Sequence, residues 1–231
     1  MKKLFTIMCI TILLFGCSQK KGSTTTNSNE EEKVYKNAYL DYEDVEVAYT
    51  MADLIGINIE DSSEIFKAAK YIVIATVESI DGGSNKNLIN GEYVYPYTYG
   101  TISIDKVYKG DIEEGSTVNY IRCGGIISYE DWYDSLSQAE KNKHDYLSKG
   151  INPKYIKSMF NDDIDIEPGK TYLMYMEDGN LRSDNEYMIA AWQAGLREIS
   201  GLENMTSNDY SSLKVLNNYT GEYESLEDVL K

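Results

Sequence analysis

Histidine, cysteine and basic residues are scarce in this sequence. Its 231 residues include one histidine, His144, and three cysteines, and 22 basic side chains stand against 38 acidic ones, a formal net charge of −16. A metal trio or a Ser-His-Asp triad would have to use His144, and no second signal accompanies it. The charge excludes nucleic acid, because duplex binding needs lysine and arginine to displace counterions. It favours basic proteins and metal cations as partners.

The first residues have the pattern of an export signal. Lys2 and Lys3 precede an uncharged run from Leu4 to Phe15, which a glycine and Cys17 follow. The run is shorter than the about 20 apolar residues that cross a bilayer. It therefore predicts a signal peptide over residues 1–16 rather than a permanent transmembrane helix.

The segment Leu14 to Cys17 resembles the bacterial lipobox, with an apolar residue three positions before a cysteine and a small residue just before it. Phe15 departs from the small residue more common at its place. The resemblance implies that Cys17 becomes the first mature residue and carries a diacylglycerol, whose acyl chains, such as palmitate, hold the protein on the outer face of a membrane. The alternative is a plain secretory signal with an incidental cysteine.

The residues after Cys17 separate the predicted anchor from the rest of the chain. Residues 18–33 contain no large apolar side chain, so they predict a flexible tether. Residues 34–231 are enough for one domain that can bury a core. With Cys9 removed and Cys17 acylated, Cys123 is the only thiol left, and we expect no intrachain disulfide.

β-Branched and aromatic runs predict a mainly β domain. Its 21 tyrosines against 4 phenylalanines indicate many half-buried rings with hydrated hydroxyls. Five strands are predicted, and residues 81–83 (Asp-Gly-Gly) are expected to form the turn after the first. In the second strand, the positions expected to face inward change from odd to even numbers at Gly100. This change predicts a bulge or a bend there. The strands are expected at residues 71–79, 93–109, 117–122, 171–176 and 186–198.

Helices are predicted before, within and after these strands. Asp61 to Glu64 has the pattern of a capping box that opens a helix over 65–70, and residues 225–231 predict a short terminal helix. A helical insertion is expected at about 128–160, between the third and fourth strands. Ser128 is expected to cap its first helix, and Ser137 with Glu140 to form a capping box at the start of the second. Gly150 is expected to end the second helix, and Asn152-Pro153 to start a third. We expect the insertion to carry binding specificity.

Four segments carry a family resemblance. Residues 69–77 are an apolar strand after a helix, residues 107–110 read V-x-K-G, residues 115–118 read G-x-x-V, and residues 169–173 read G-x-x-Y-L. Together they resemble exported bacterial domains with an OB-like, netrin/TIMP-like barrel, over about Asp61 to Ile199. The resemblance implies a five-stranded Greek-key barrel used as a binding module. The TIMP inhibitor mechanism needs a free N-terminal cysteine amine, which an acylated Cys17 would lack.

Aromatic residues are the main candidates for binding. Tyr93, Tyr95, Tyr97 and Tyr99 occupy one face of the second strand, and Pro96 marks it as an edge strand, so the rings could stack on a glycan or a peptide. The alternative is that the insertion or residues 34–59 cover them. Trp132, Tyr133 and Leu136 share a helix face that either packs on the barrel or joins the binding surface.

Three other features have both a chemical and a structural interpretation. His144 is expected to be a surface or half-buried helix residue, and Cys123 a small buried apolar residue rather than a nucleophile. Residues 161–167 alternate carboxylates in a pattern that superficially resembles a calcium loop. An EF-hand loop requires glycine at its sixth position, whereas a loop counted from Asp163 has Pro168 at that position. We therefore expect no metal and no cofactor, and a solvated acidic segment.

These observations favour a lipid-anchored extracytoplasmic binding protein without catalytic activity, whose partner is a protein or another component of the cell envelope. One alternative is an enzyme acting on the cell wall through acidic residues of the insertion, such as Glu130, Asp131 or Asp134. Nothing in the sequence pairs these carboxylates across a bond, as a glycosidase needs. A protease-inhibitor-like module is the other alternative.

The predicted anchor can be tested by replacing Cys17 with alanine. Because the acyl chains would supply the membrane attachment, Cys17→Ala should move the protein to the medium or leave it unprocessed. Fractionation of the cells followed by mass spectrometry of the N-terminus measures both outcomes. A correctly cleaved Cys17→Ala protein that stays in the membrane fraction would contradict lipid anchoring.

Overall fold

The computed structural model describes residues 33–50, 58, 60–205 and 209–231. The predicted signal peptide, Cys17 and nearly all of the predicted tether lie outside these residues. The described part is mainly β, as the sequence predicts, and contains twelve strands, four α-helices and five short 3-10 helices. Among the described residues, no helix is long and apolar enough to cross a membrane.

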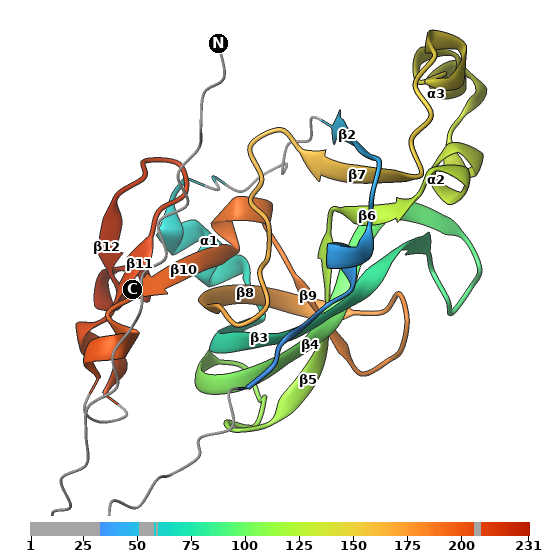
Figure 1. Ribbon diagram of the computed structural model, residues 1–231. Helices are drawn as coiled ribbons and strands as arrows, with labels where there is room; N and C mark the ends of the chain where they lie inside the picture. Colours follow the sequence, from blue (N-terminus) through green and yellow to red (C-terminus); the bar gives the residue numbers. More distant parts are fainter. Residues whose placement is uncertain (1–32, 51–57, 59, 206–208) are drawn as a thin grey trace, which may run out of the picture. The chain divides into compact units, whose positions relative to one another are not determined.

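Five strands pair in a closed circuit. β3 pairs with β4, β4 with β5, β5 with β9, β9 with β8, and β8 again with β3. All of these pairings are antiparallel except that of β5 with β9. Figure 1 shows these strands side by side in the lower half of the view. Their bounds are Tyr71–Lys86 for β3, Tyr93–Lys109 for β4, Thr117–Cys123 for β5, Thr171–Gly179 for β8 and Glu186–Ile189 for β9.

Further strands extend this sheet beyond the circuit. β1 (Lys36–Asn37) pairs in parallel with β3, and β10 (Leu196–Ser200) pairs with β8. β11 (Lys214–Leu216) and β12 (Tyr223–Ser225) continue from β10. The helices α1 (Ser62–Ala68) and α4 (Leu226–Val229) contribute Ile65, Leu226 and Val229 to the core on this side.

Two cores lie on opposite faces of β3 and β8. Val73, Ala75 and Met174 belong to one cluster, whereas Ile74 and Leu173 belong to the other. Successive side chains of a strand point to opposite faces, so both faces of these two strands are buried. Burying apolar surface on both faces explains why β3 begins as an almost continuous apolar run.

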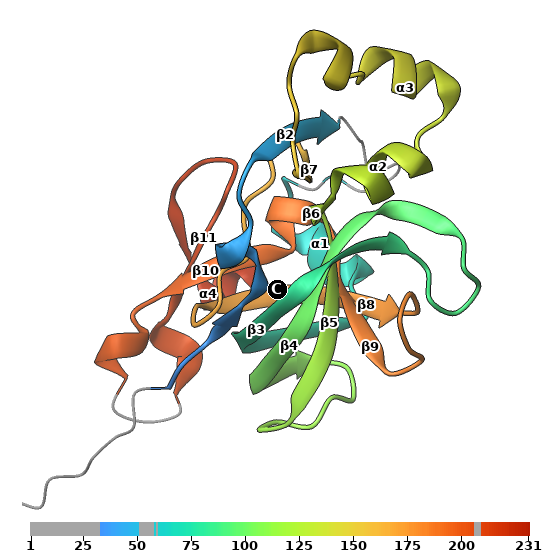
Figure 2. The same ribbon diagram turned by 45° about the vertical axis from the view of Figure 1, so that its right-hand side comes forward.

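A second sheet contains three strands that are far apart in the sequence. β7 (Tyr155–Phe160) lies between β2 (Val45–Thr50), to which it is parallel, and β6 (Gly125–Ser128), to which it is antiparallel. The helices α2 (Tyr129–Ser135) and α3 (Gln138–Lys143) and the 3-10 helix η2 (Leu147–Lys149) connect β6 to β7. Figures 1 and 2 both show this sheet with α2 and α3 at one end of the five-strand circuit.

The second sheet includes a segment that the sequence predicted to be part of the helical insertion. The first two helices and their N-terminal caps are confirmed, since the Ser128 side chain accepts from the Asp131 amide and Ser137 forms a capping box with Glu140. The predicted end of the second helix at Gly150 is wrong, because α3 ends at Lys143 and Gly150 instead follows the 3-10 helix η2. The expected third helix is wrong, because residues 155–160 form β7. Both edges of β7 are paired and Ile156 is fully buried, so tertiary pairing overrides the helical start signal.

Two other predicted boundaries are also wrong. The glycines at 82 and 83 do not turn the chain, because β3 continues to Lys86 and the connection to β4 is at residues 87–92. A Cβ at Gly83 would lie 2.2 Å from the Ile126 carbonyl oxygen, so this glycine permits close backbone approach. The predicted fifth strand is divided into β9 and β10 by the 3-10 helix η3 (Trp192–Ala194), where Ala191 and Trp192 have positive φ angles.

Gly100 lies where the parity change predicts an irregularity. Gly100 pairs with Ile80, and the β3–β4 register shifts on both sides of this pair, with the additional residues on β3. A Cβ at Gly100 would lie 2.0 Å from the carbonyl oxygen of Ser79. The two long strands therefore approach each other at a point that only glycine allows.

Substitution of Gly100 tests this contact. Gly100→Ala should lower the free energy of unfolding by about 3 kcal/mol, because backbone must move to accept the methyl group. Gly115→Ala is the control, since nothing lies within 4 Å of its Cβ and only its φ of +81° opposes alanine, at a cost of about 1–2 kcal/mol. Urea denaturation measures both, and equal losses for the two variants would contradict the proposed close approach.

Candidate functional site

A cavity of about 340 Å³ lies between the second sheet, the helices α2 and α3, and the beginning of β4. We call it the aromatic cavity. It contains three of the aromatic residues selected from the sequence together with a fourth that the sequence did not indicate. Its lining comprises Ala48, Tyr49, Thr50, Tyr93, Val94, Tyr95, Pro96, Trp132, Ser135, Leu136, Glu140, His144 and Ser158.

The aromatic rings of this cavity differ in their exposure. Tyr49 and Tyr93 are 61% and 49% exposed, so both rings are accessible to a ligand. Tyr95 is half-buried and stacks on Phe160 of β7 at 4.9 Å between ring centroids. Trp132 is buried, with its ring 5.3 Å from that of His144 in an edge-on arrangement. The cavity thus has two accessible rings and two that packing holds in place.

Two titratable side chains line the cavity from α3 and its end. Hydrogen bonds from Ser137 hold the pKa of the Glu140 carboxyl below its usual value. Burial, together with the charges of Lys143 and Lys149, lowers the pKa of His144 below the ordinary 6.5. At neutral pH the cavity therefore holds an ionised Glu140 and a neutral His144, which supply hydrogen-bond acceptors.

The tyrosine ladder of β4 is not one continuous exposed surface. Tyr93 and Tyr95 line the aromatic cavity, whereas Tyr97 is 1% exposed and its hydroxyl donates to the Lys86 carbonyl at 2.8 Å. Tyr99 is half-buried, and the guanidinium carbon of Arg182 lies 3.5 Å above its ring centre. Tyr97 is therefore unavailable to a ligand, and the binding role of the ladder remains a prediction for its first two rings.

The aromatic face of α2 packs where the sequence did not place it. Trp132, with Tyr133 and Leu136 beside it, packs against Ala48, Ile127 and Ile156 of the second sheet, not the core of the strand circuit. Tyr133 stacks on Tyr129 at 5.5 Å, and Lys141 lies over its ring. Tyr133 consequently supports the wall of the site, whereas Trp132 reaches the cavity itself.

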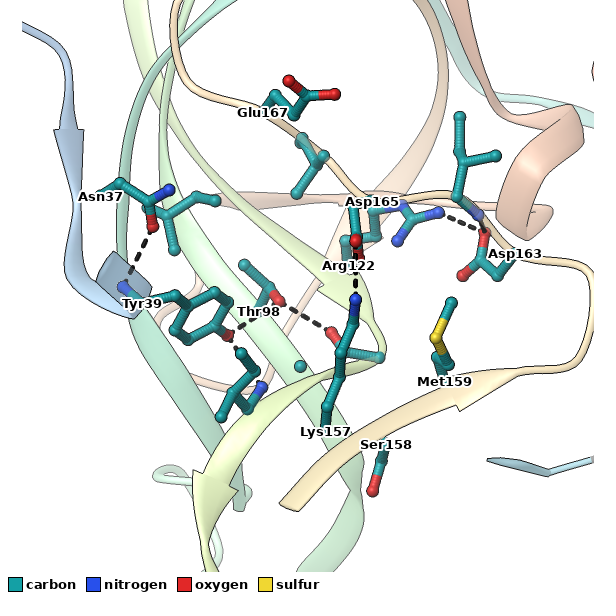
Figure 3. Close-up of a pocket in the computed structure, with 16 residues that line it drawn as sticks. Asn37, Tyr39, Thr98, Arg122, Lys157, Ser158, Met159, Asp163, Asp165 and Glu167 are labelled. Carbon is teal, nitrogen blue, oxygen red and sulfur yellow. Dashed lines mark hydrogen bonds and ion pairs between the residues drawn. The ribbon is translucent and has the colours of Figure 1, made fainter. Parts of the chain in front are cut away.

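A second cavity, of about 220 Å³, lies between β1, β6, β7 and residues 163–167 (Figure 3). We call it the inner cavity. Arg122, at the end of β5, forms an ion pair with Asp163, and their side chains are only 5% and 1% exposed. Lys157 pairs with Asp165 at 2.6 Å on the same wall. Ser158 lines both cavities, which therefore lie on either side of β7.

The acidic segment distributes its carboxylates among different cations. Asp163 pairs with Arg122, Asp165 with Lys157, and Glu167 with Lys170. Burial raises the pKa of the Asp163 carboxyl, and the Arg122 guanidinium opposes that rise. Among the described residues, no group of three or more His, Cys, Asp or Glu side chains could hold a metal ion.

The other candidate catalytic residues lie apart from the aromatic cavity. Cys123 is half-buried, and burial raises the pKa of its thiol, which keeps the sulfur protonated at neutral pH. Asp131 accepts a hydrogen bond from Ser128 and pairs with Lys86. Among the described residues that line the two cavities, none is Cys123, Glu130, Asp131 or Asp134.

Sequence reasoning missed Tyr49 and the Arg122–Asp163 pair. Tyr49 belongs to β2, a strand that becomes visible only through its pairing with β7. Arg122 gave one signal, an arginine at the end of the apolar strand β5 beside Ile121. Its partner is 41 residues further along the chain, beyond the reach of any local pattern.

Comparison with known proteins gives no assignment, because no protein-family model, no curated protein and no solved structure matches the chain. The geometry of the two cavities is therefore the basis for any functional conclusion.

The position of His144 predicts a pH effect on fluorescence. A protonated imidazole quenches the fluorescence of a neighbouring indole. In a Trp192→Phe variant, the fluorescence of Trp132 should therefore decrease as the pH is lowered, with a midpoint below pH 6.5. Since the pKa is lowered in the fold, the unfolded chain binds this proton first, and stability falls as pH drops below about 6.5. His144→Gln should abolish the fluorescence transition, and its persistence in that variant would contradict the assignment.

Proposed function

We propose that the chain is a lipid-anchored extracytoplasmic binding protein without catalytic activity, which binds a neutral glycan of the cell envelope in the aromatic cavity. The export signal and the lipobox-like segment support attachment through Cys17. The tether of residues 18–33 would let the domain stand clear of the lipid headgroups. The observation that carries the proposal is the cavity itself, where exposed tyrosine rings meet hydrogen-bonding groups.

The strand circuit supports an OB-like Greek-key barrel. Numbered along the chain, its strands pair in the order first, second, third, fifth, fourth and back to the first, with the third and fifth parallel. Five-stranded barrels of this kind bind oligonucleotides or oligosaccharides with the second and third strands and the neighbouring loops. Tyr93 begins the second strand of the circuit, directly after the connection at residues 87–92. In such a barrel the aromatic cavity would lie beside the loop between the first two strands, which OB folds use for binding.

The net charge of the protein limits the chemical class of the ligand. A net charge of −16 repels anionic polymers, and Glu140 in the cavity adds a local negative charge. A sugar ring has apolar C–H faces that pack on tyrosine rings, and its hydroxyls can donate to the Glu140 carboxylate and to His144. An uncharged glycan therefore fits both the rings and the polar rim.

The protonation states support binding rather than catalysis. A glycosidase needs one carboxyl with a raised pKa as the general acid, whereas the Glu140 carboxyl has a lowered pKa. Glu140 also serves as the N3 residue of the capping box, and its Oε2 accepts hydrogen bonds from the Ser137 amide and hydroxyl. Asp131 is a candidate catalytic residue of the alternative cell-wall enzyme. Its carboxylate accepts a hydrogen bond from Ser128 and forms an ion pair with Lys86.

Sedimentation with an insoluble cell-wall glycan, freed of anionic polymers, tests the proposal. Tyr49→Ala and Tyr93→Ala should each weaken binding about tenfold, because each removes an accessible ring at a cost of about 1.4 kcal/mol. Tyr223→Ala is the matched control, since Tyr223 is 45% exposed and lies on β12, outside the cavity.

The outcomes separate binding from the alternatives. Equal retention of the Tyr93→Ala and Tyr223→Ala variants would contradict the aromatic cavity as the site. Release of soluble sugar from the glycan by the wild-type protein would contradict the non-catalytic assignment.

A further inference from the structure

The protein contains two deeply buried arginines that differ in their hydrogen bonding. Arg197 donates through Nε to the Leu216 carbonyl at 2.9 Å, through Nη1 to Ser62 at 2.9 Å and through Nη2 to Glu224. Its guanidinium therefore has the partners that a structural role requires. Arg122 is equally buried but donates through Nη2 to Asp163, and its Nε has no hydrogen-bond partner among the described residues.

Asp163 is incompletely bonded in the same way. Its Oδ1 accepts from Arg122 and from the Ile164 amide, whereas its Oδ2 has no partner in the described part of the chain. A buried polar atom without a hydrogen bond costs about 1–3 kcal/mol, so two of them on one ion pair call for an explanation. Both side chains line the inner cavity (Figure 3).

From this juxtaposition we propose that the inner cavity is a second binding site, which takes a small uncharged molecule with adjacent hydroxyl groups, about the size of one monosaccharide. A hydroxyl group is neutral and can both accept and donate, so adjacent hydroxyls of one molecule can accept from Nε–H of Arg122 and donate to Oδ2 of Asp163. The site does not depend on the function proposed for the aromatic cavity.

The charges of the cavity favour a neutral ligand. Arg122 is compensated by Asp163, and Lys157 by Asp165. An ionised ligand would meet no uncompensated charge of opposite sign on these two pairs, and burying it would cost several kcal/mol. Further hydroxyl groups would reach the polar side of the cavity, where the Tyr39 hydroxyl lies 2.9 Å from Thr98 Oγ1.

The size and the apolar lining agree with a ring-shaped ligand. A cavity of about 150 Å³ holds a benzene molecule, so about 220 Å³ has room for a six-membered ring with substituents. Side chains of Ile126, Met159, Ile164 and Ile166 line the remainder and can pack on the C–H groups of such a ring.

Calorimetric titration of the Cys17→Ala chain with uncharged monosaccharides, N-acetylglucosamine and glucose among them, tests the site. The wild-type cavity should bind at least one with a dissociation constant below about 10 mM. The double variant Arg122→Met/Asp163→Leu should fold, because apolar residues of similar volume replace a buried ion pair at little cost. It should bind the same sugar at least tenfold more weakly.

Two controls make the result specific. Arg197→Met/Glu224→Leu replaces the fully bonded arginine pair and should leave the affinity unchanged, as should Tyr223→Ala, since Tyr223 is 45% exposed and lies on β12, outside both cavities. Absence of binding by the wild-type protein would overturn the proposal. So would equal binding by wild type and the Arg122→Met/Asp163→Leu variant, or a crystal structure grown with the sugar in which water alone bonds Arg122 Nε and Asp163 Oδ2.

Discussion

The pairing of β3 with both β4 and β8 is the interaction on which the structure depends. It closes the five-strand circuit and places β3 between two cores, with Val73 and Ala75 on one side and Ile72 and Ile74 on the other. An interior strand of this kind cannot be lost without exposing both clusters. The register shifts of β3 against β4 around Gly100 lie between the part of each strand in the circuit and the part formed by the end of β3 and the beginning of β4. The beginning of β4, with Tyr93 and Tyr95, reaches the second sheet.

The sequence predicted those elements whose signals are local. The second and third strands of the circuit were found almost to the residue, because the turn glycines Gly110 and Gly115 mark the end of the second strand and the start of the third. The caps at Asp61, Ser128 and Ser137 were also found, since each rests on a hydrogen bond to an amide two or three residues away. The turn predicted at the glycines 82 and 83 was wrong, because these glycines instead allow close contact with the Ile126 backbone and the Tyr99 ring.

The second sheet could not be predicted for a different reason. β2, β6 and β7 come from segments around residues 45, 125 and 155, and none of them is long or strongly apolar. β7 becomes a strand because β2 and β6 satisfy its backbone on both edges, which outweighs a helical start signal at Asn152-Pro153. The aromatic cavity and the inner cavity lie on the two sides of this strand. Sequence reasoning therefore found Tyr93, Tyr95 and Trp132, but it could not show that they meet Tyr49 or that Arg122 meets Asp163.

Chemical-shift mapping with a soluble, uncharged glycan oligomer can show whether the aromatic cavity is the binding site. Trp132 lines the cavity and gives an indole N–H signal, whereas Tyr223 lies on β12, outside the cavity. Binding in the aromatic cavity predicts a dose-dependent shift of the Trp132 signal together with the amides of Tyr49 and Tyr93, while the amide of Tyr223 stays unchanged. Shifts centred on Tyr223 and β12, or saturation with no change at Trp132 and Tyr93, would contradict it.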